Sequence, residues 1–388
     1  MRVTPGRDRV VSETADIIVI GGGIAGASLA WQLRGTHRVV ILESENSPSH
    51  HATGRSAALM TPYAGAPMIR AASLASRSFL LSPPNGFSPV PLTSSRGVLR
   101  LAAEDGRDTL VAALKEGLEI GRPLSMLGRD DLLAMGLPIS ERVTCGLLDT
   151  EAQDIDVDAL HRSYLKGSQA DLRLNAPVQK IRRSGPDWIV ETPQGAITAP
   201  VVVNAAGAFA DRVAQLAGLA PIGLTPCKRT IAHFDIPGHQ TAQWPLLADP
   251  QFSFYVKPEA TGILLSPSDA TPSDPGEVWP DDMDIAIAVD RMQDWLKLTV
   301  RRPKASWSGL RSFFPDEDPV AGFDAEADGF FWYAGQGGYG IQSSPALSRV
   351  AAAILRNDTI PPDLTAAGLT GAALSPSRFS EQLRKGLS

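Results

Sequence analysis

The chain has 388 residues, of which 43% are hydrophobic and 20% charged, and its formal net charge is −6. Its length exceeds that of most single hydrophobic cores and predicts two domains. The acidic balance argues against nucleic acid as a partner, because phosphate binding needs a basic face. The two cysteines, Cys145 and Cys227, form no CxxC pattern, which favours a reducing compartment over a disulfide framework.

The N-terminal residues give no sign of export or membrane anchoring. Residues 1–14 lack the apolar segment of a signal peptide, and we expect them to form a poorly ordered extension. No stretch approaches the roughly 20 apolar residues that span a bilayer. We therefore expect a cytoplasmic protein without a transmembrane anchor.

The next segment carries a dinucleotide-binding motif. Asp16–Ile20 is a short run rich in β-branched residues, typical of a buried parallel strand, and Ile24–Leu33 has a helical pattern. Gly21 and Gly23 lie between this strand and this helix, and Gly26 lies in the first turn of the helix, so that the three form a G-x-G-x-x-G motif. These glycines permit, in order, a tight turn, close approach of a pyrophosphate and packing of the helix on the strand. The N-terminus of the helix then faces the phosphates.

The segments that follow favour FAD over NAD. A second apolar strand, RVVILE, ends in Glu43, where a ribose hydroxyl needs an acceptor and where a carboxylate would repel the extra phosphate of NADP. The pattern then stops, and two distant segments repeat the order strand, small-residue turn, helix. They begin at Val201–Asn204 and at the FFW sequence of Phe330–Trp332. A nucleotide domain assembled from distant segments suits a long ligand such as FAD.

Several colinear motifs resemble the D-amino-acid oxidase (DAO) superfamily of flavoenzymes. They include ATGRSA (Ala52–Ala57), VVVNAAGAFAD (Val201–Asp211), GLRSF (Gly309–Phe313) and GGYGIQ (Gly337–Gln342). Among its members, the chain looks most similar to bacterial D-arginine dehydrogenases. The resemblance implies noncovalent FAD on a Rossmann-like domain, covered by a second domain built on an antiparallel sheet. The expected fold class is therefore α/β, or α+β overall.

The domains are expected to be discontinuous. Residues 15–84, 153–221 and 318–388 would form the FAD-binding domain, and residues 85–152 and 222–317 the substrate domain. Alternating patterns predict strands at Lys228–Ile236 and Phe252–Pro258, and a hairpin over residues 187–198. The apolar spacing of residues 283–300 predicts a helix.

Cofactor-binding residues follow from the glycine motif and from the resemblance. We expect Gly337–Gln342 to open a helix whose N-terminus faces the pyrimidine end of the flavin, where negative charge develops on reduction. The expected cofactor-binding residues are Gly21, Gly23, Ile24, Ala25, Gly26, Glu43, Thr53, Gly54, Arg55, Ser56, Ala57, Val178, Ala206, Gly207, Gly337, Gly338, Tyr339, Gly340, Ile341 and Gln342.

Two arginines occupy positions where the family holds a substrate carboxylate. Arg229 follows Pro226 in a predicted strand, and Arg311 lies beside aromatic residues, which is unusual for a free surface charge. A guanidinium binds a carboxylate through two parallel hydrogen bonds. We expect Tyr255 to present its hydroxyl to the substrate, and Gln336 to bond the flavin or the substrate amine.

The predicted substrate pocket is more apolar than that of a D-arginine dehydrogenase. Its expected residues are Leu59, Thr61, Tyr63, Ala64, Val98 and Tyr339. Val98 aligns with a glutamate that suits a guanidinium in D-arginine dehydrogenases. Its loss would remove a contact worth roughly 1.5–3 kcal/mol, so D-arginine should not be preferred. We expect Val98→Glu to raise activity toward D-arginine and D-lysine.

Two other groups of polar residues receive structural interpretations. His50 and His51 lie in a polar loop without a carboxylate at ligand spacing, so we expect a solvated loop and no metal site. Asp154, Asp156 and Asp158 lack the glycine and distal glutamate of a calcium loop. Capping of the following helix explains them better.

The expected reaction is oxidative deamination of a neutral or apolar D-amino acid. As the resemblance implies, hydride passes from Cα to flavin N5, and the imino acid hydrolyses to a 2-oxo acid and ammonia without an enzyme base. One alternative is a glycine- or sarcosine-type amine oxidase that passes electrons to O2. Another is a flavin-bearing partner or sensor protein without turnover. The electron acceptor (a quinone, an electron carrier or O2), oligomeric state and peripheral membrane association stay open.

Overall fold

The computed structural model describes residues 13–259 and 261–379. Residues 1–12 of the predicted N-terminal extension lie outside the described residues. Glu13–Thr14, however, form strand β1, which pairs in parallel with β13 (Gly195–Ala199). The expectation of a poorly ordered segment is therefore wrong for these two residues, because the edge of a small sheet provides backbone partners for them.

A six-stranded sheet holds the glycine motif. Its strands are parallel except for the last pair, in the order β10 (Asp171–Arg173), β3 (Val39–Leu42), β2 (Ile17–Ile20), β14 (Val201–Asn204), β22 (Phe330–Ala334) and β21 (Val320–Phe323). All six strands come from the three segments predicted to bind FAD. Parallel strands covered on both faces are continuously apolar, as IIVI and VVIL are here.

Different elements cover the two faces of this sheet. Ile17 and Val19 point into a core with α1 (Ile24–Leu33) and α8 (Gly340–Leu355). Ile18 and Ile20 point into a second core with the small sheet of β1, β11 (Lys180–Ser184), β12 (Asp187–Thr192) and β13. The remaining helices on this side of the molecule are α2 (Pro67–Leu81), α5 (Val157–Ser168), α6 (Ala210–Leu216), α9 (Pro362–Ala366) and α10 (Gly371–Leu374).

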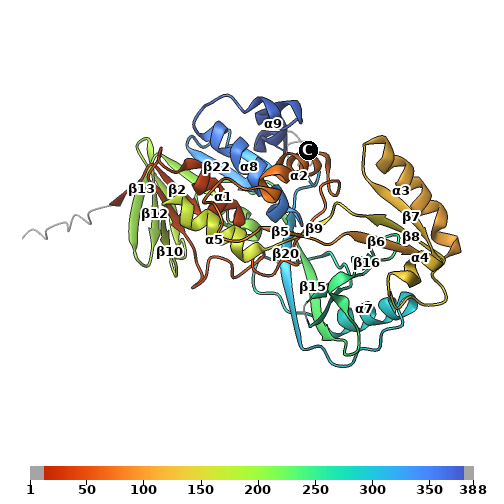
Figure 1. Cartoon of the computed structure of the whole chain (residues 1–388). Coiled ribbons are helices and arrows are strands. Elements are labelled where there is room, and N and C mark those ends of the chain that lie inside the picture. The colour runs from red at the N-terminus through yellow and green to blue at the C-terminus, as the bar shows by residue number, and fades with distance from the viewer. Residues whose placement is uncertain (1–12, 260, 380–388) are drawn as a thin grey trace, which may run out of the picture.

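A nine-stranded, mainly antiparallel sheet forms the other part of the molecule, on the right in Figure 1. Its order is β19 (Thr271–Pro272), β15 (Thr225–Asp235), β18 (Gly262–Ser266), β17 (Tyr255–Glu259), β16 (Leu246–Ala248), β6 (Val98–Ala102), β8 (Cys145–Asp149) and β7 (Leu124–Gly128), and β20 (Ala305–Phe313) also pairs with β15. Only β16 and β6 pair in parallel.

The two faces of the nine-stranded sheet differ in what they contact. Leu99, Leu101 and Phe234 pack in a core with α7 (Asp282–Trp295). Helices α3 (Arg107–Glu119) and α4 (Arg129–Ala134) lie near β7 and β8. The opposite face carries Val98 and Tyr255, because side chains alternate along a strand. A three-stranded sheet of β4 (Leu59–Met60), β9 (Gln153–Ile155) and β5 (Thr93–Ser95) completes the fold.

Most predicted elements are confirmed. The structure has the first helix and the strand β14 at their predicted residues, and β12 and β13 form the predicted hairpin. The predicted helix over residues 283–300 ends earlier, at Trp295, because the chain turns extended and Leu296 bridges to Ile139. Asp156 caps α5 by accepting a hydrogen bond from the Ala159 amide, as predicted. The domain boundaries stay a prediction.

Candidate active site

A cavity of about 840 Å³ is lined by residues from both large sheets and from the loops between them. All the predicted catalytic and substrate-pocket residues line it. Of the predicted cofactor residues, Gly26, Gly54 and Gln342 do not line the cavity, and all the others do. The three exceptions have packing or bonding roles behind its wall.

The glycine loop has the close contacts that its sequence predicts. Gly21 has a φ of +107°, and a Cβ there would lie 2.5 Å from the carbonyl oxygen of Ala205. A Cβ on Gly26 would lie 2.0 Å from the Gly21 oxygen, so this glycine lets α1 pack against the loop. A Cβ on Gly54 would lie 2.1 Å from the Ser49 oxygen. Gly26 and Gly54 therefore shape the cavity from behind.

Two buried side chains hold Gly22, and sequence reasoning identified only one of them. Glu43 Oε2 accepts a hydrogen bond from the Gly22 amide at 2.9 Å. His161, on α5, donates from Nε2 to the Gly22 carbonyl at 2.8 Å. Burial lowers the pKa of His161, which keeps the ring neutral. No sequence signal marks His161, because its partner lies 139 residues earlier.

Thr53 connects the second cofactor segment to the first. Its Oγ1 accepts a hydrogen bond from the Ile24 amide at 3.0 Å, in the first turn of α1. Ile24 and Ala25, in this turn, line the cavity together with Gly21 and Gly23. Such an arrangement of glycines and helix amides fits a pyrophosphate.

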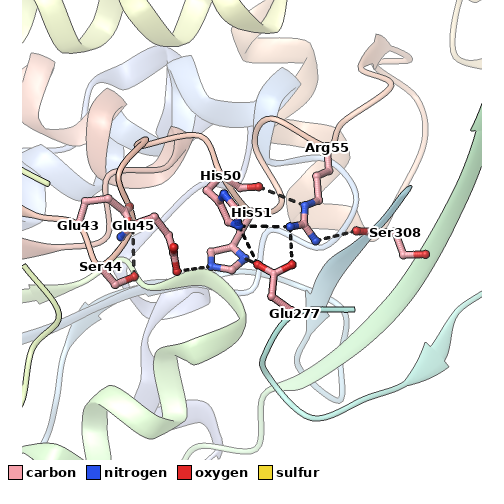
Figure 2. Close-up of polar contacts among 8 residues, drawn as sticks. All are labelled: Glu43, Ser44, Glu45, His50, His51, Arg55, Glu277 and Ser308. Carbon is pink, nitrogen blue, oxygen red and sulfur yellow. Dashed lines mark hydrogen bonds and ion pairs between the residues drawn. The ribbon is translucent and has the colours of Figure 1, made fainter. Parts of the chain in front are cut away.

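The loop that carries His50 and His51 is partly exposed to solvent, as expected, but carboxylates lie beside both histidines, which the sequence analysis did not predict. Figure 2 shows that Glu277 joins both His50 and Arg55, at 2.7 Å in each case. His51 pairs with Glu45 at 3.2 Å. Ligand atoms of Glu45, His50 and His51 lie within 4.8 Å of one another. The expectation of no metal site stays a prediction.

Arg55 fastens this loop to the substrate side of the cavity. Its guanidinium also donates to the carbonyl of Ser308 on β20, at 3.0 Å (Figure 2). Arg55 and, to a lesser extent, His50 lower the pKa of Glu277. The network connects three segments that are distant in sequence, and only the tertiary fold reveals it.

Arg229 and Arg311 meet on neighbouring strands. In the β15–β20 register, Arg229 is opposite Gly309 and Arg311 is opposite Cys227, so the two arginines are diagonal neighbours on one face. Arg229 donates from Nε to the Asp269 carbonyl at 2.6 Å and also bonds Tyr255. Burial, and next the charge of Arg311, lower the pKa of Arg229.

Arg311 differs from Arg229 in its partners. Within the part of the chain that the structure describes, its guanidinium has no hydrogen-bond or ion-pair partner. A Cβ on Gly338 would lie 2.8 Å from Arg311 Nη1, so the guanidinium packs closely against the backbone of this glycine. Gln336 Nε2 is also buried without a partner in the described residues. Both groups line the cavity and can bind a ligand there.

Gln342 has a different place from the one expected. It is buried on α8, accepts from the Thr61 amide at 2.7 Å and donates to Ser73 at 2.9 Å. It therefore anchors the loop that carries Thr61, and the expectation of direct cofactor contact is corrected. Neither cysteine lines the cavity.

The far end of the cavity is only partly apolar. Val98, Leu246 and Tyr255 form one buried cluster, against which Leu59 packs, as the sequence predicts. Arg100 and Arg122, however, also line this end, together with Asp149. The expectation of an apolar pocket is corrected here. Sequence reasoning missed both arginines, because nothing in their neighbouring residues distinguishes them from surface charges.

The chain belongs to the DAO family of FAD dependent oxidoreductases, whose family model matches residues 16–354. Glycine oxidase of Geobacillus kaustophilus (strain HTA426) is 26% identical over 92% of this chain and 96% of its own. FAD-dependent oxidoreductase domain-containing protein 1 of Xenopus laevis is 23% identical over 88% of this chain and 79% of its own. Mitochondrial dimethylglycine dehydrogenase of Homo sapiens is 32% identical over 32% of this chain and 15% of its own.

Solved structures share the fold. The crystal structure of glycine oxidase from Geobacillus kaustophilus has a TM-score of 0.79 and 21% identity, covering 92% of this chain and 99% of that chain. L-proline dehydrogenase from P. horikoshii has a TM-score of 0.78 and 20% identity, covering 96% and 99%. The predicted mixed α/β fold and the FAD cofactor are confirmed. The narrower likeness to D-arginine dehydrogenases stays a prediction.

No helix in residues 13–259 and 261–379 is long and apolar enough to cross a membrane.

Proposed function

We propose that this oxidoreductase oxidises the C–N bond of an α-amino acid whose carboxylate binds between Arg229 and Arg311. The observation that carries the proposal is the unpartnered Arg311 guanidinium, which lines the cavity diagonally across from Arg229. The two cations repel each other: after burial, the charge of Arg311 is the second cause of the lowered pKa of Arg229, and Asp269, 3.7 Å from Arg229 Nε, offsets it only in part. A bound carboxylate relieves this repulsion and accepts the bidentate hydrogen bonds that arginine provides.

The side chains of the cavity orient the substrate for oxidation. The glycine loop and the α8 N-terminus would hold FAD, which when bound would supply the acceptor for a hydride from the substrate α-carbon. The amine binds neutral, and its nitrogen lone pair forms the C=N bond as that hydride leaves. Water then hydrolyses the imino acid to a 2-oxo acid and ammonia. Tyr255 holds Arg229 in place, and the free Gln336 amide group can bond the flavin or the substrate amine.

Two substrate classes fit this site. The resemblance to D-amino-acid oxidases favours a D-amino acid other than D-arginine, whose guanidinium would meet the charges of Arg100 and Arg122. The full-length similarity to a glycine oxidase favours glycine or an N-alkyl glycine. Both classes use the same carboxylate anchor, and transfer of electrons to O2 would make the enzyme an oxidase.

An anaerobic flavin spectrum tests the proposal. The purified protein is mixed with D- and L-amino acids, glycine, sarcosine and simple amines without a carboxylate. We expect amino acids to bleach the flavin bands and carboxylate-free amines to leave them unchanged. Bleaching by the simple amines alone would refute the carboxylate anchor. A flavin that no compound reduces would instead support a partner or sensor protein. Peroxide formation in air separates an oxidase from a dehydrogenase.

A further inference from the structure

We propose that the substrate carries a second carboxylate, which Arg100 and Arg122 bind at the far end of the cavity, so that the preferred substrate is an amino dicarboxylate. This inference rests on the proposed function, because it assumes an amino acid held by Arg229 and Arg311. It goes beyond that function by naming the group that the other end of the substrate presents.

The strand register places Arg100 on the same face as Tyr255. Tyr255 is opposite Ala248 on β16, and Ala248 is in turn opposite Arg100 on β6. Residues opposite each other in a sheet point to the same side, and adjacent strands are about 4.8 Å apart. Tyr255 and Arg100 are therefore separated by roughly 10 Å at the backbone. Ala248, between them, is fully buried and does not line the cavity, so Val98 and Leu246 form the cavity wall on this face.

This separation selects a short substrate. Tyr255 bonds Arg229, so it marks the end of the cavity where the first carboxylate binds. Arg100, which also lines the cavity, marks the opposite end of this gap. Val98 and Leu246 flank the gap with apolar surface that suits methylene groups. An amino dicarboxylate of the length of aspartate or glutamate matches these features.

The charges at the far end leave a positive excess. Arg122 pairs with Asp149 at 2.7 Å, and this carboxylate also accepts from the Glu151 amide at 2.9 Å. Arg100 has no hydrogen-bond or ion-pair partner among the described residues. Two guanidinium groups thus share one carboxylate. The other acid that acts on Arg100, Glu116, is exposed on α3.

Two further observations favour the binding of an anion between these arginines. Burial, and next the charge of Arg122, lower the pKa of Arg100. Arg122 Nε is buried without a hydrogen-bond partner in the described residues. A buried cation and a buried donor both cost free energy when they are unpaired. A ligand carboxylate between the two arginines would pair with both groups.

Acid and amide pairs provide a direct test, because each pair has nearly the same shape and differs in charge. Anaerobic flavin reduction is measured with aspartate against asparagine and glutamate against glutamine, in both configurations. We expect the acid to be preferred by about 10- to 100-fold in reduction rate over dissociation constant, the range of a charge-assisted hydrogen bond. In Arg100→Gln this preference should fall to near one, and Arg100→Lys should restore part of it.

Arg142→Gln is the matched control. Arg142 is exposed, pairs with Asp294 at 3.6 Å and does not line the cavity, so its loss should leave the acid preference unchanged. Thermal unfolding of Arg100→Gln separates recognition from a structural role, because Arg100 has no protein partner to lose. Equal rates for acids and amides in the wild type, or an acid preference that survives Arg100→Gln, would overturn this inference alone. No reduction by any amino acid would overturn the proposed function as well.

Discussion

Replacing Arg229 and Arg311 by methionine tests the carboxylate anchor, because the two arginines differ in their protein partners. Arg229 bonds the Asp269 carbonyl and Tyr255, whereas Arg311 has no partner among the described residues. Methionine keeps much of the length and apolar contact of the side chain and removes its charge. Both variants should lose substrate binding, but only one should lose stability.

The structure gives the expected magnitudes. Each guanidinium would donate charge-assisted hydrogen bonds to the substrate, so either substitution should weaken binding by about 1.5–3 kcal/mol, or roughly 10- to 100-fold. Arg229→Met also leaves the Asp269 carbonyl and Tyr255 without their donor, which costs about 1–3 kcal/mol of unfolding free energy. Arg311→Met leaves no protein group unpaired and removes a repulsion, so its unfolding free energy should stay equal or rise.

Two measurements decide the outcome. Anaerobic titration of the flavin spectrum with the best amino acid gives the dissociation constant, and urea unfolding at equal FAD saturation gives the stability. The reasoning is wrong if Arg311→Met binds the amino acid as tightly as the wild type. It is also wrong if Arg311→Met is destabilised as much as Arg229→Met, since that would mean that Arg311 is a structural residue.

Three further predictions concern the cofactor half of the molecule. Gly26→Ala places a Cβ 2.0 Å from the Gly21 oxygen, and we expect it to lower the free energy of unfolding by about 1–3 kcal/mol and to weaken FAD binding. Gly371→Ala is the control, because its Cβ would have its nearest atom at 3.9 Å, and thermal melts should show no loss of stability or of FAD binding. Burial lowers the pKa of His161 below its ordinary 6.5, so the contribution of the neutral ring to folding stability is complete above pH 6.5 and is lost as the pH falls through the folded pKa. In thermal melts measured against pH, His161→Gln should lack this loss of stability. Arg55 and His50 lower the pKa of Glu277 from 4.5, so the contribution of its carboxylate to folding stability is complete above pH 4.5 and is lost as the pH falls through the lower folded pKa. Glu277→Gln should release FAD faster at neutral pH in a dilution assay, and an unchanged release rate would show that this network does not hold the cofactor loop.

The elements that sequence reasoning placed correctly are those whose signal is local. Ile17–Ile20 is apolar throughout, as a strand covered on both faces must be, and a G-x-G-x-x-G turn and a helix follow it. Arg311 also had a local signal, because it lies among aromatic residues. The helix predicted over residues 283–300 was too long, because the apolar spacing continues after Trp295 while the backbone becomes extended.

The partners of the site residues had no local signal. Gly22 bonds a histidine 139 residues away, Arg55 pairs with a glutamate 222 residues away, and Arg229 bonds a carbonyl 40 residues away. The apolar pocket expected around Val98 was wrong in part for the same reason. Its neighbours across the cavity come from other strands and loops, and a charge among them is invisible in the sequence around Val98.

The sequence by itself determined the dinucleotide-binding loop, because glycine spacing, strand and helix are properties of one continuous segment, and the order of distant segments together with the family resemblance pointed to FAD. Only the tertiary structure decided which charges meet the substrate. The parallel pairing of β16 with β6 joins residues 246–248 to residues 98–100, and thereby aligns Arg100 with Tyr255. Strand register depends on packing of the whole sheet, so no segment of the sequence encodes that alignment alone.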